Sequence, residues 1–444
     1  MSRRMLVLTV LLVACSSKST RDSADSGNAD PAGAGDTGNP EEGLDDIVPD
    51  WPTTLVGTDQ QLCYDAAGEV DCPEEGAAFH GQDAQYAATS PAYTATDSLV
   101  RDDNTGLVWQ RAQVDGLEWS EAADYCDSLQ LGGRHDWRVP TTKELYSLIQ
   151  FDGSTGNGSE DYGEVPDNAV PYIDTDAFDF AYGDTAAGER YIDSQFISQT
   201  VYVSRVFADS QGVEAGQEAF FGVNFADGRI KGYPTSAGQT WQLRCVSGVT
   251  DYGENDLEDI GDGTVLDNAT GRMWTREDSG GLGGGPAGDG LVGWAGAMDF
   301  CENIDVGGHT DWRLPDAKEL QGLVDYSRSP DTTASAAIDP VFASTVITDE
   351  AGDDNYGWYW TGTTHLDGLV LGADAVYVAF GEALGHTSLG TSSGEAMFLD
   401  VHGAGAQRGD PKVGSPDDFP TWGAGPQGDV RRVHNLARCV RTEG

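Results

Sequence analysis

The sequence predicts an α+β fold in which one domain occurs twice in tandem, and three observations support this prediction. Apolar residues at helix spacing come early in each half of the chain, strand-like runs follow them, and the same sequence blocks recur in both halves. The 444 residues include 11 Trp, 16 Tyr and 14 Phe, which is enough apolar mass for hydrophobic cores. We therefore expect folded domains and not a wholly disordered acidic polymer.

The charge balance excludes one class of partner. The chain carries 74 acidic against 25 basic side chains, a formal net charge of -49. A surface this negative repels phosphate backbones and anionic lipid headgroups. We therefore exclude nucleic-acid binding through a basic face, whereas cationic partners, metal ions and neutral glycans remain open.

The start of the chain predicts export. Arg3 and Arg4 form a basic region, an apolar run follows as far as Val13, and Cys15 closes a small-residue cleavage site. The apolar run is too short to span a bilayer. It resembles a bacterial lipobox, which implies that residues 1–14 are a signal peptide and that Cys15 is lipidated and anchors the protein to the membrane. The alternative is an ordinary signal peptide in which this Cys is incidental.

The segment after Cys15 predicts an address and a tether. Ser16 resembles the residue at this position in lipoproteins sent to the outer membrane, so we expect an exported, lipid-anchored protein at the outer membrane or cell surface of a Gram-negative bacterium. Residues 15–50 contain no aromatic residue and few large aliphatic residues. Because such a composition buries too little surface to offset the entropy of ordering, we expect a disordered tether.

Three recurring blocks indicate that the rest of the chain is a duplicated domain. The stretch from Thr105 to Trp109 recurs from Thr270 to Trp274, and the block 119–126 recurs at 294–301. The block from Asp136 to Leu145 recurs from Asp311 to Leu320. We place the first domain, with an N-terminal hairpin, at residues 51–248 and the second at residues 249–444.

Each copy is expected to begin with helices and to continue with strands. Trp119, Ala122 and Cys126 share one face of a helix, and their counterparts do the same. Capping boxes after a proline start a second helix, at Thr141 in the first copy and at Asp316 in the second. Strand-like runs follow at residues 196–197, 200–203, 220–225, 359–360 and 376–380.

Six cysteines follow Cys15 and predict disulfides, because an exported chain lies in an oxidising compartment. Six cysteines allow about fifteen pairings, and the repeat favours one of them. The expected pairs are Cys63 with Cys72 around a turn, Cys126 with Cys245, and Cys301 with Cys439. A zinc site has little support, since no CxxC is present and the His residues are scattered.

Together these blocks resemble the Lcl C-terminal domain family, which is named after a collagen-like bacterial surface adhesin. The family motif falls on ten residues: Asp136, Trp137, Arg138, Pro140 and Glu144, and in the second copy Asp311, Trp312, Arg313, Pro315 and Glu319. The Trp-Arg-Leu-Pro stretch also resembles the second-helix entry of C-type-lectin-like folds, where a Cys on the first helix pairs with one on the last strand. The resemblance implies two tandem C-type-lectin-like domains after the disordered tether.

The resemblance implies a non-catalytic surface protein with a role in binding or adhesion, whose ligand is a glycan, an extracellular-matrix component or a protein. The eponymous adhesin is associated with sulfated glycosaminoglycans, which require a basic surface. This chain is strongly acidic and has no Gly-X-Y repeat, so we do not expect sulfated ligands. The competing hypotheses are an enzyme that acts on envelope polysaccharide and a purely structural envelope protein. The expected binding face is formed by the long loops between the second helix and the closing Cys of each copy.

Two further sets of residues are weighed as sites. Asp136 with Arg138, and their counterparts in the second copy, fit internal hydrogen bonds before the second helix better than a ligand site. No cofactor is required, and calcium is the metal for which oxygen-rich loops exist. The candidate calcium ligands are Asp152, Asn157, Asp161, Asp353 and Asp354. Neither loop has EF-hand spacing, and a solvated acidic surface is the plainer interpretation.

Overall fold

Short strands open each copy and pair with the strand that closes it. In the computed structural model, which describes residues 44, 46, 55–157, 162–419 and 423–442, β5 (Val108–Gln110) pairs with β4 (Leu99–Asp102) and with the closing strand β13 (Val246–Ser247). In the same way, β16 (Arg272–Thr275) pairs with β15 (Thr264–Asp267) and with the closing β24 (Val440–Thr442). β3 (Tyr93–Ala95) and β14 (Leu257–Asp259) complete these two four-stranded sheets. The signal peptide, Cys15, the tether as far as residue 43 and Asp161 lie outside the described residues.

The helices begin where the sequence predicts. In the first copy a 3₁₀ turn, η2 (Trp119–Glu121), leads into α1 (Ala122–Ser128), and α2 (Thr142–Ser147) follows. The second copy has α3 (Trp294–Glu302), α4 (Ala317–Gly322) and the short α5 (Pro330–Thr333). Thr141 and Asp316 cap α2 and α4 by accepting hydrogen bonds from the backbone N–H of Glu144 and Glu319, so both capping boxes are confirmed.

The long strands of both copies join in one eight-stranded sheet. Its order is β19-β20-β23-β11-β10-β7-β12-β6. The first copy supplies β6 (Val114–Leu117), β7 (Gln195–Phe196), β10 (Ala219–Asn224), β11 (Arg229–Pro234) and β12 (Trp241–Leu243). The second copy supplies β19 (Trp358–His365), β20 (Asp374–Ala379) and β23 (Gln407–Pro411). The two sets meet where Ile230 of β11 pairs with Gln407 of β23, so both copies belong to one compact unit, residues 41–444.

One smaller sheet also combines strands of both copies. The four-stranded sheet β21-β22-β8-β9 contains β8 (Val206–Ala208) and β9 (Ala215–Gln217) from the first copy and β21 (Leu384–Thr387) and β22 (Met397–Asp400) from the second. β17 (Val346–Thr348) pairs with β18 (Asp354–Tyr356). The structure is thus an α+β fold with more strand than helix, as predicted.

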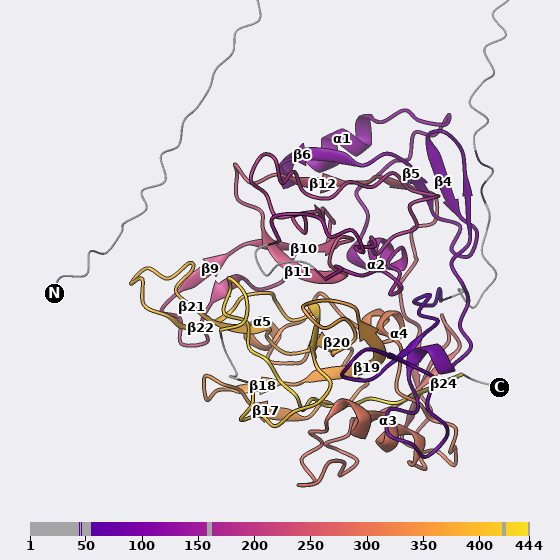
Figure 1. Cartoon of the computed structure of the whole chain (residues 1–444), viewed down its shortest axis with the longest axis vertical. Helices are drawn as coiled ribbons and strands as arrows, with labels where there is room; N and C mark the ends of the chain where they lie inside the picture. The colour runs from indigo at the N-terminus through magenta and orange to yellow at the C-terminus, as the bar shows by residue number, and fades with distance from the viewer. Residues whose placement is uncertain (1–43, 45, 47–54, 158–161, 420–422, 443–444) are drawn as a thin grey trace, which may run out of the picture. The chain divides into compact units, whose positions relative to one another are not determined.

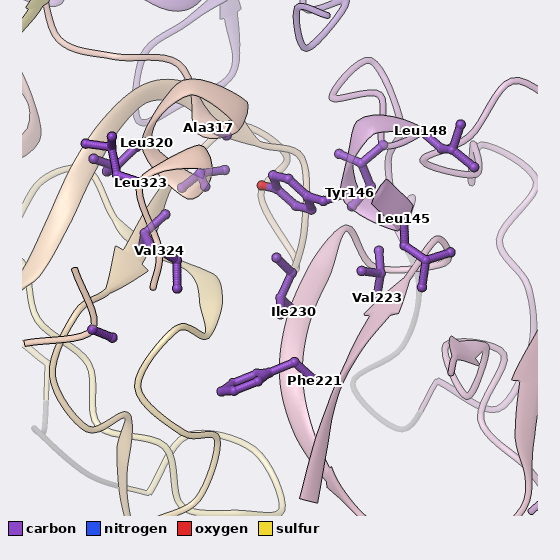
Figure 2. Packing of buried hydrophobic residues seen from close by; sticks show 14 of the residues in the cluster. Leu145, Tyr146, Leu148, Phe221, Val223, Ile230, Ala317, Leu320, Leu323 and Val324 are labelled. Atoms are coloured by element: carbon purple, nitrogen blue, oxygen red, sulfur yellow. The ribbon is translucent and has the colours of Figure 1, made fainter. Parts of the chain in front are cut away.

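The largest hydrophobic core spans the two copies. Figure 2 shows α2 and α4 with their apolar side chains directed toward the shared sheet, and Tyr146 of α2 lies between the two helices. The inward residues that the capping boxes and the helix period predict, among them Leu145, Leu148, Leu320 and Val324, are buried. The two second helices thus pack together over one sheet, and each copy also has a smaller cluster of its own, which contains Cys126 and Cys245 in the first copy and Cys301 and Cys439 in the second.

The N-terminal segment contacts both copies, since Gln60 donates to the carbonyls of Phe151 in the first copy and Thr364 in the second, at 3.0 and 2.9 Å, and its hairpin lies on the second copy. It contains the hairpin of β1 (Cys63–Tyr64) and β2 (Glu69–Val70) and the 3₁₀ helix η1 (Asp83–Gln85). Lys412 Nζ donates to the Tyr64 carbonyl at 3.0 Å, and Tyr86 donates its hydroxyl to Glu302 of α3 at 2.9 Å. In Figure 1 this indigo segment lies beside β19 and α3. The sequence assigns the hairpin to the first domain, whereas the contacts of the hairpin are with the second domain.

The three predicted disulfides are confirmed, and one predicted strand is wrong. Cys63 is bonded to Cys72, Cys126 to Cys245 and Cys301 to Cys439. The run 200–203 is not a strand, because only Val201 makes an isolated bridge, to Phe220. The chain turns there because Tyr202 points inward and donates its hydroxyl to Asp400 at 2.7 Å. Within the described part of the chain, no helix has both the length and the hydropathy needed to cross a membrane.

Candidate functional site

The polar motif residues make internal bonds that hold the start of the second helix. Arg138 donates two hydrogen bonds to Glu144, at 2.7 and 2.6 Å, and Arg313 donates two to Glu319 at the same distances. Burial acts to raise the pKa of Glu319, but the charge and hydrogen bonds of Arg313 outweigh it, so that pKa is lowered. Glu144 and Glu319 are also the capping-box residues, which means that each Arg fixes a helix cap.

The remaining motif residues are engaged in the same region. Asp136 accepts hydrogen bonds from the Ser247 hydroxyl at 2.6 Å and from the Gly248 amide at 3.1 Å, and Asp311 accepts one from Arg441 at 2.8 Å. Trp137, Trp312 and the two motif prolines, Pro140 and Pro315, are buried. These side chains connect the turn before the second helix to the closing strand.

The two motif lysines link the copies, because each lysine donates a hydrogen bond to the second helix of the other copy. Lys143 donates to the carbonyl of Gly322, the last residue of α4, at 2.8 Å, and Lys318 donates to the carbonyl of Ser147, the last residue of α2, at 2.7 Å. A cation at the end of a helix neutralises carbonyl groups that have no partner within the helix. Burial lowers the pKa of both lysines to about 8. The sequence contains the lysines in its motif, but nothing local in it indicates their partners.

A groove of about 950 Å³ lies on the long-loop face. Its walls come from β7, β11, β12 and the loop 181–193 of the first copy, and from residues of the second copy at 389–390 and 427. The side chains that line it are mainly aromatic, amide and acidic: Tyr182, Phe207, Tyr233, Trp241, Gln195, Gln217, Gln239, Gln242, Gln427, Asp115, Asp184, Glu189, Asp193 and Arg190. A concave site with a few polar groups among aromatic residues is the usual form of a ligand-binding site.

Aromatic rings form one wall of the groove. The rings of Tyr233 and Trp241 lie 5.1 Å apart, and Trp241 also packs edge-on against Phe220 at 5.9 Å. Tyr182 is supported from behind by Phe180 and Tyr191, with centroid distances of 5.2 and 5.7 Å. These contacts hold the rings in place before a ligand arrives, which reduces the entropy lost on binding.

Four polar atoms of the groove wall have no hydrogen-bond partner among the described residues. They are the hydroxyls of Tyr182 and Tyr233, Trp241 Nε1 and Gln242 Oε1, and all four are buried. Buried polar groups are normally paired, and an unpaired one costs about 1–3 kcal/mol. Burial raises the pKa of Tyr182 to about 12 and also raises that of Tyr233, so both hydroxyls remain hydrogen-bond donors at neutral pH.

The family follows from the motif blocks that build these elements. The model of the Lcl C-terminal domain matches residues 98–247 and 263–401. The chain belongs to the Lcl C-terminal domain family. The first match runs from β4 to β13, and the second ends after β22. No curated protein and no solved structure matches the chain at a significant level.

The groove is not built from the Lcl motif. Its residues come from loops and from strands that are far apart in the sequence, and the structure brings none of the ten motif residues into its lining. The sequence predicts the long loops as the binding face, which stays a prediction, and it does not single out the residues that line this groove. Trp241, four residues before the closing Cys245, is the one local signal, since a half-buried Trp on a short polar strand is unusual.

The backbone is strained at one groove residue of the first Lcl copy. Phe207 has φ 57°, a left-handed conformation that is rare for a bulky side chain. Its neighbour across the groove is Gly390 of the second copy, where an added Cβ would lie 3.0 Å from Phe207. Strained residues of this kind concentrate at binding sites, because the surrounding structure has to hold them in place.

The candidate calcium ligands lie on two separate loops. Asp353 accepts hydrogen bonds from Ser210 and from Gln211 of the first copy, and Asp354 begins β18. Asp152 and Asn157 are exposed, and Asp161 is not described. Among the described residues, no three His, Cys, Asp or Glu side chains are grouped to hold a metal. Calcium binding stays a prediction.

Proposed function

We propose that this Lcl-domain protein is an exported, non-catalytic binding protein that attaches a Gram-negative cell surface to a glycan or extracellular-matrix ligand. The observation that carries the proposal is the groove, which opens on the loops between the second helix and the closing Cys of the first copy and is completed by the second copy. Cys15 would carry the lipid anchor, and the tether 15–50 would hold the folded part away from the membrane.

The proposal extends to the fold of each copy. In both copies a Cys on the first helix is bonded to a Cys beside the closing strand, and the second helix starts at the Arg-Pro motif. We infer from these features that each copy is C-type-lectin-like. Folds of this kind bind ligands through long loops, and such loops line the groove.

The chemistry of the groove favours a sugar over other ligands. Aromatic rings such as those of Tyr233 and Trp241 offer flat apolar faces with a polar edge. The amides Gln195, Gln217 and Gln239 both donate and accept hydrogen bonds, which suits ligands with many hydroxyl groups. The unpaired Trp241 Nε1 would gain a partner when a ligand or a bridging water binds.

The test is binding of the full-length chain, in mild detergent, to an array of neutral and charged glycans. We expect selective binding that Trp241→Ala reduces about tenfold, as loss of one ring stacked on a ligand predicts. Trp119→Ala is the matched control, because Trp119 packs on the same Phe220 at 6.4 Å but does not line the groove. Equal losses in both variants would attribute the effect to the fold, and no binding to any glycan would overturn the proposal. Release of reducing ends from a bound polysaccharide would favour the enzyme instead.

The lipid anchor has its own test. Cells that express the chain and are grown with radiolabelled palmitate should label it, and Cys15→Ser should abolish the label and release the protein from the membrane fraction. A labelled Cys15→Ser protein would overturn the anchor at Cys15.

A further inference from the structure

We propose that the groove takes a glycan chain that carries free amino groups, an inference that rests on the groove being the binding site proposed above. The inference comes from the charge of the groove wall. Among its described lining residues, Arg190 is the one cation, and it donates two hydrogen bonds to Asp193, at 3.2 and 2.6 Å. Its charge is therefore already neutralised within the wall.

Three carboxylates of the wall, Asp115, Asp184 and Glu189, make no ion pair with another residue in the described parts of the chain. Asp184 accepts hydrogen bonds from the amides of Ala186 and Ala187, Glu189 accepts one from the Asp184 amide, and Asp115 accepts one from the Gln113 side chain. All of these donors are neutral. The carboxylates are exposed and retain free lone pairs, so each can accept a hydrogen bond from an ammonium group.

A second observation favours a ligand with hydroxyl groups. Tyr233 is only 9% exposed, it lines the groove, and its hydroxyl has no partner among the described residues. The Tyr182 hydroxyl and Gln242 Oε1 also have no partner among the described residues, although both side chains are partly exposed. Carboxylates alone would attract any cation, but the unpaired hydroxyls beside two aromatic rings match a sugar ring with its own hydroxyl groups.

The charge of the groove also excludes glycans that carry negative charge. A sulfated or phosphorylated chain would bring negative charge next to Asp115, Asp184 and Glu189, on a protein whose net charge is -49. Like charges brought together in this way repel one another. An amine-bearing glycan gains attraction from the same residues.

The experiment compares two probes that differ only at nitrogen. Calorimetry with the full-length chain measures binding of the β-1,4-linked tetramer of glucosamine and of its N-acetylated form, at low salt and at about pH 6, where carboxylates and amines are both charged. We expect the amine form to bind about tenfold more tightly, because three exposed ion pairs contribute little each, and we expect salt to remove the difference.

Two triple variants locate the effect. Asp115→Asn, Asp184→Asn and Glu189→Gln keep the shape of the groove and should abolish the preference for the amine form. The control, Asp71→Asn, Glu74→Gln and Glu75→Gln, removes the same charge from exposed positions outside the groove and should keep the preference. A preference that survives the groove variant would overturn the inference.

The remaining outcomes separate this inference from the proposed function. Equal binding of both tetramers, sensitive to Trp241→Ala, would leave the groove as a glycan site and overturn the amine class. Binding of neither tetramer would overturn the inference for this ligand class. Tight binding of tetralysine that ignores Trp241→Ala would mean that charge alone acts, and would overturn both proposals for the groove.

Discussion

One buried Arg makes equivalent internal bonds in each of the two copies, but the side chains on the shared sheet differ between them. Arg244 donates to the carbonyls of Gln110, Arg111 and Asp179, and Arg438 donates to those of Thr275, Arg276 and Ala343. Each guanidinium also lies over two aromatic rings of its own copy. The frame of the domain is therefore the same in both copies, and the difference between them lies in the side chains on the sheet.

One pair of positions explains why the groove opens on the first copy. Phe196 pairs with Val223 in the first copy as Tyr359 pairs with Val378 in the second, so Gln195 corresponds to Trp358. In the second copy Trp358 stacks on Tyr377 at 4.6 Å, and Arg432 covers the indole at 3.9 Å. In the first copy this position is a Gln that lines the groove. A buried aromatic stack in one copy thus corresponds to a wall of the groove in the other.

Exchanging these two residues should produce the largest effects. Trp358→Gln removes a 1% exposed indole and its stacking, which should cost about 3–5 kcal/mol of unfolding free energy. Gln195→Trp should instead fill part of the groove and weaken glycan binding at least about tenfold. Denaturant unfolding measures the first effect and calorimetry the second. Unchanged ligand binding in Gln195→Trp would contradict the assignment of the groove.

Arg244→Met and Arg438→Met should have matching effects, because the two guanidinium groups hold equivalent carbonyls. Each variant leaves three carbonyl groups without their donor, one of them on a buried residue (Gln110 or Thr275), so we expect a loss of about 3 kcal/mol in either copy. Denaturant unfolding of both variants provides the comparison. A large loss in one copy and none in the other would mean that the copies are not held in the same way.

The sequence predicted the parts of the fold that depend on neighbours in the chain. The capping boxes at Thr141 and Asp316 span only four residues each, and the repeat selected the pairs Cys126 with Cys245 and Cys301 with Cys439 by position. Long-range contacts leave no local pattern in the sequence. Examples are the pairing of Ile230 with Gln407 and the contact of Tyr64 with Lys412. The groove was missed for the same reason. The run 200–203 was assigned to a strand on its β-branched residues, and the inward turn of Tyr202 overrode that propensity.

The smallest expected effects come from the exchanged lysines, and they differ between the copies. Lys143 donates to two carbonyls, of Gly322 and Gly253, both at 2.8 Å, whereas Lys318 donates to that of Ser147. Substitution by Met should cost about 1–2 kcal/mol, with the larger loss for Lys143→Met. Equal losses would indicate that the bond to Gly253 contributes nothing to stability.

The pH dependence of the stability loss distinguishes the contribution of the lysine charges from that of side-chain packing. Burial lowers the pKa of both lysines to about 8, whereas an unfolded Lys titrates near 10.4. Between about pH 8 and 10 the unfolded chain therefore binds two protons that the folded chain has released, and the contribution of the lysines to stability rises with pH. The unfolding free energy of the natural chain, relative to that of the Lys143→Met and Lys318→Met double variant, should increase across this interval. A difference that falls with rising pH would mean that the lysines stay charged in the folded chain and that the charge itself holds the two copies together.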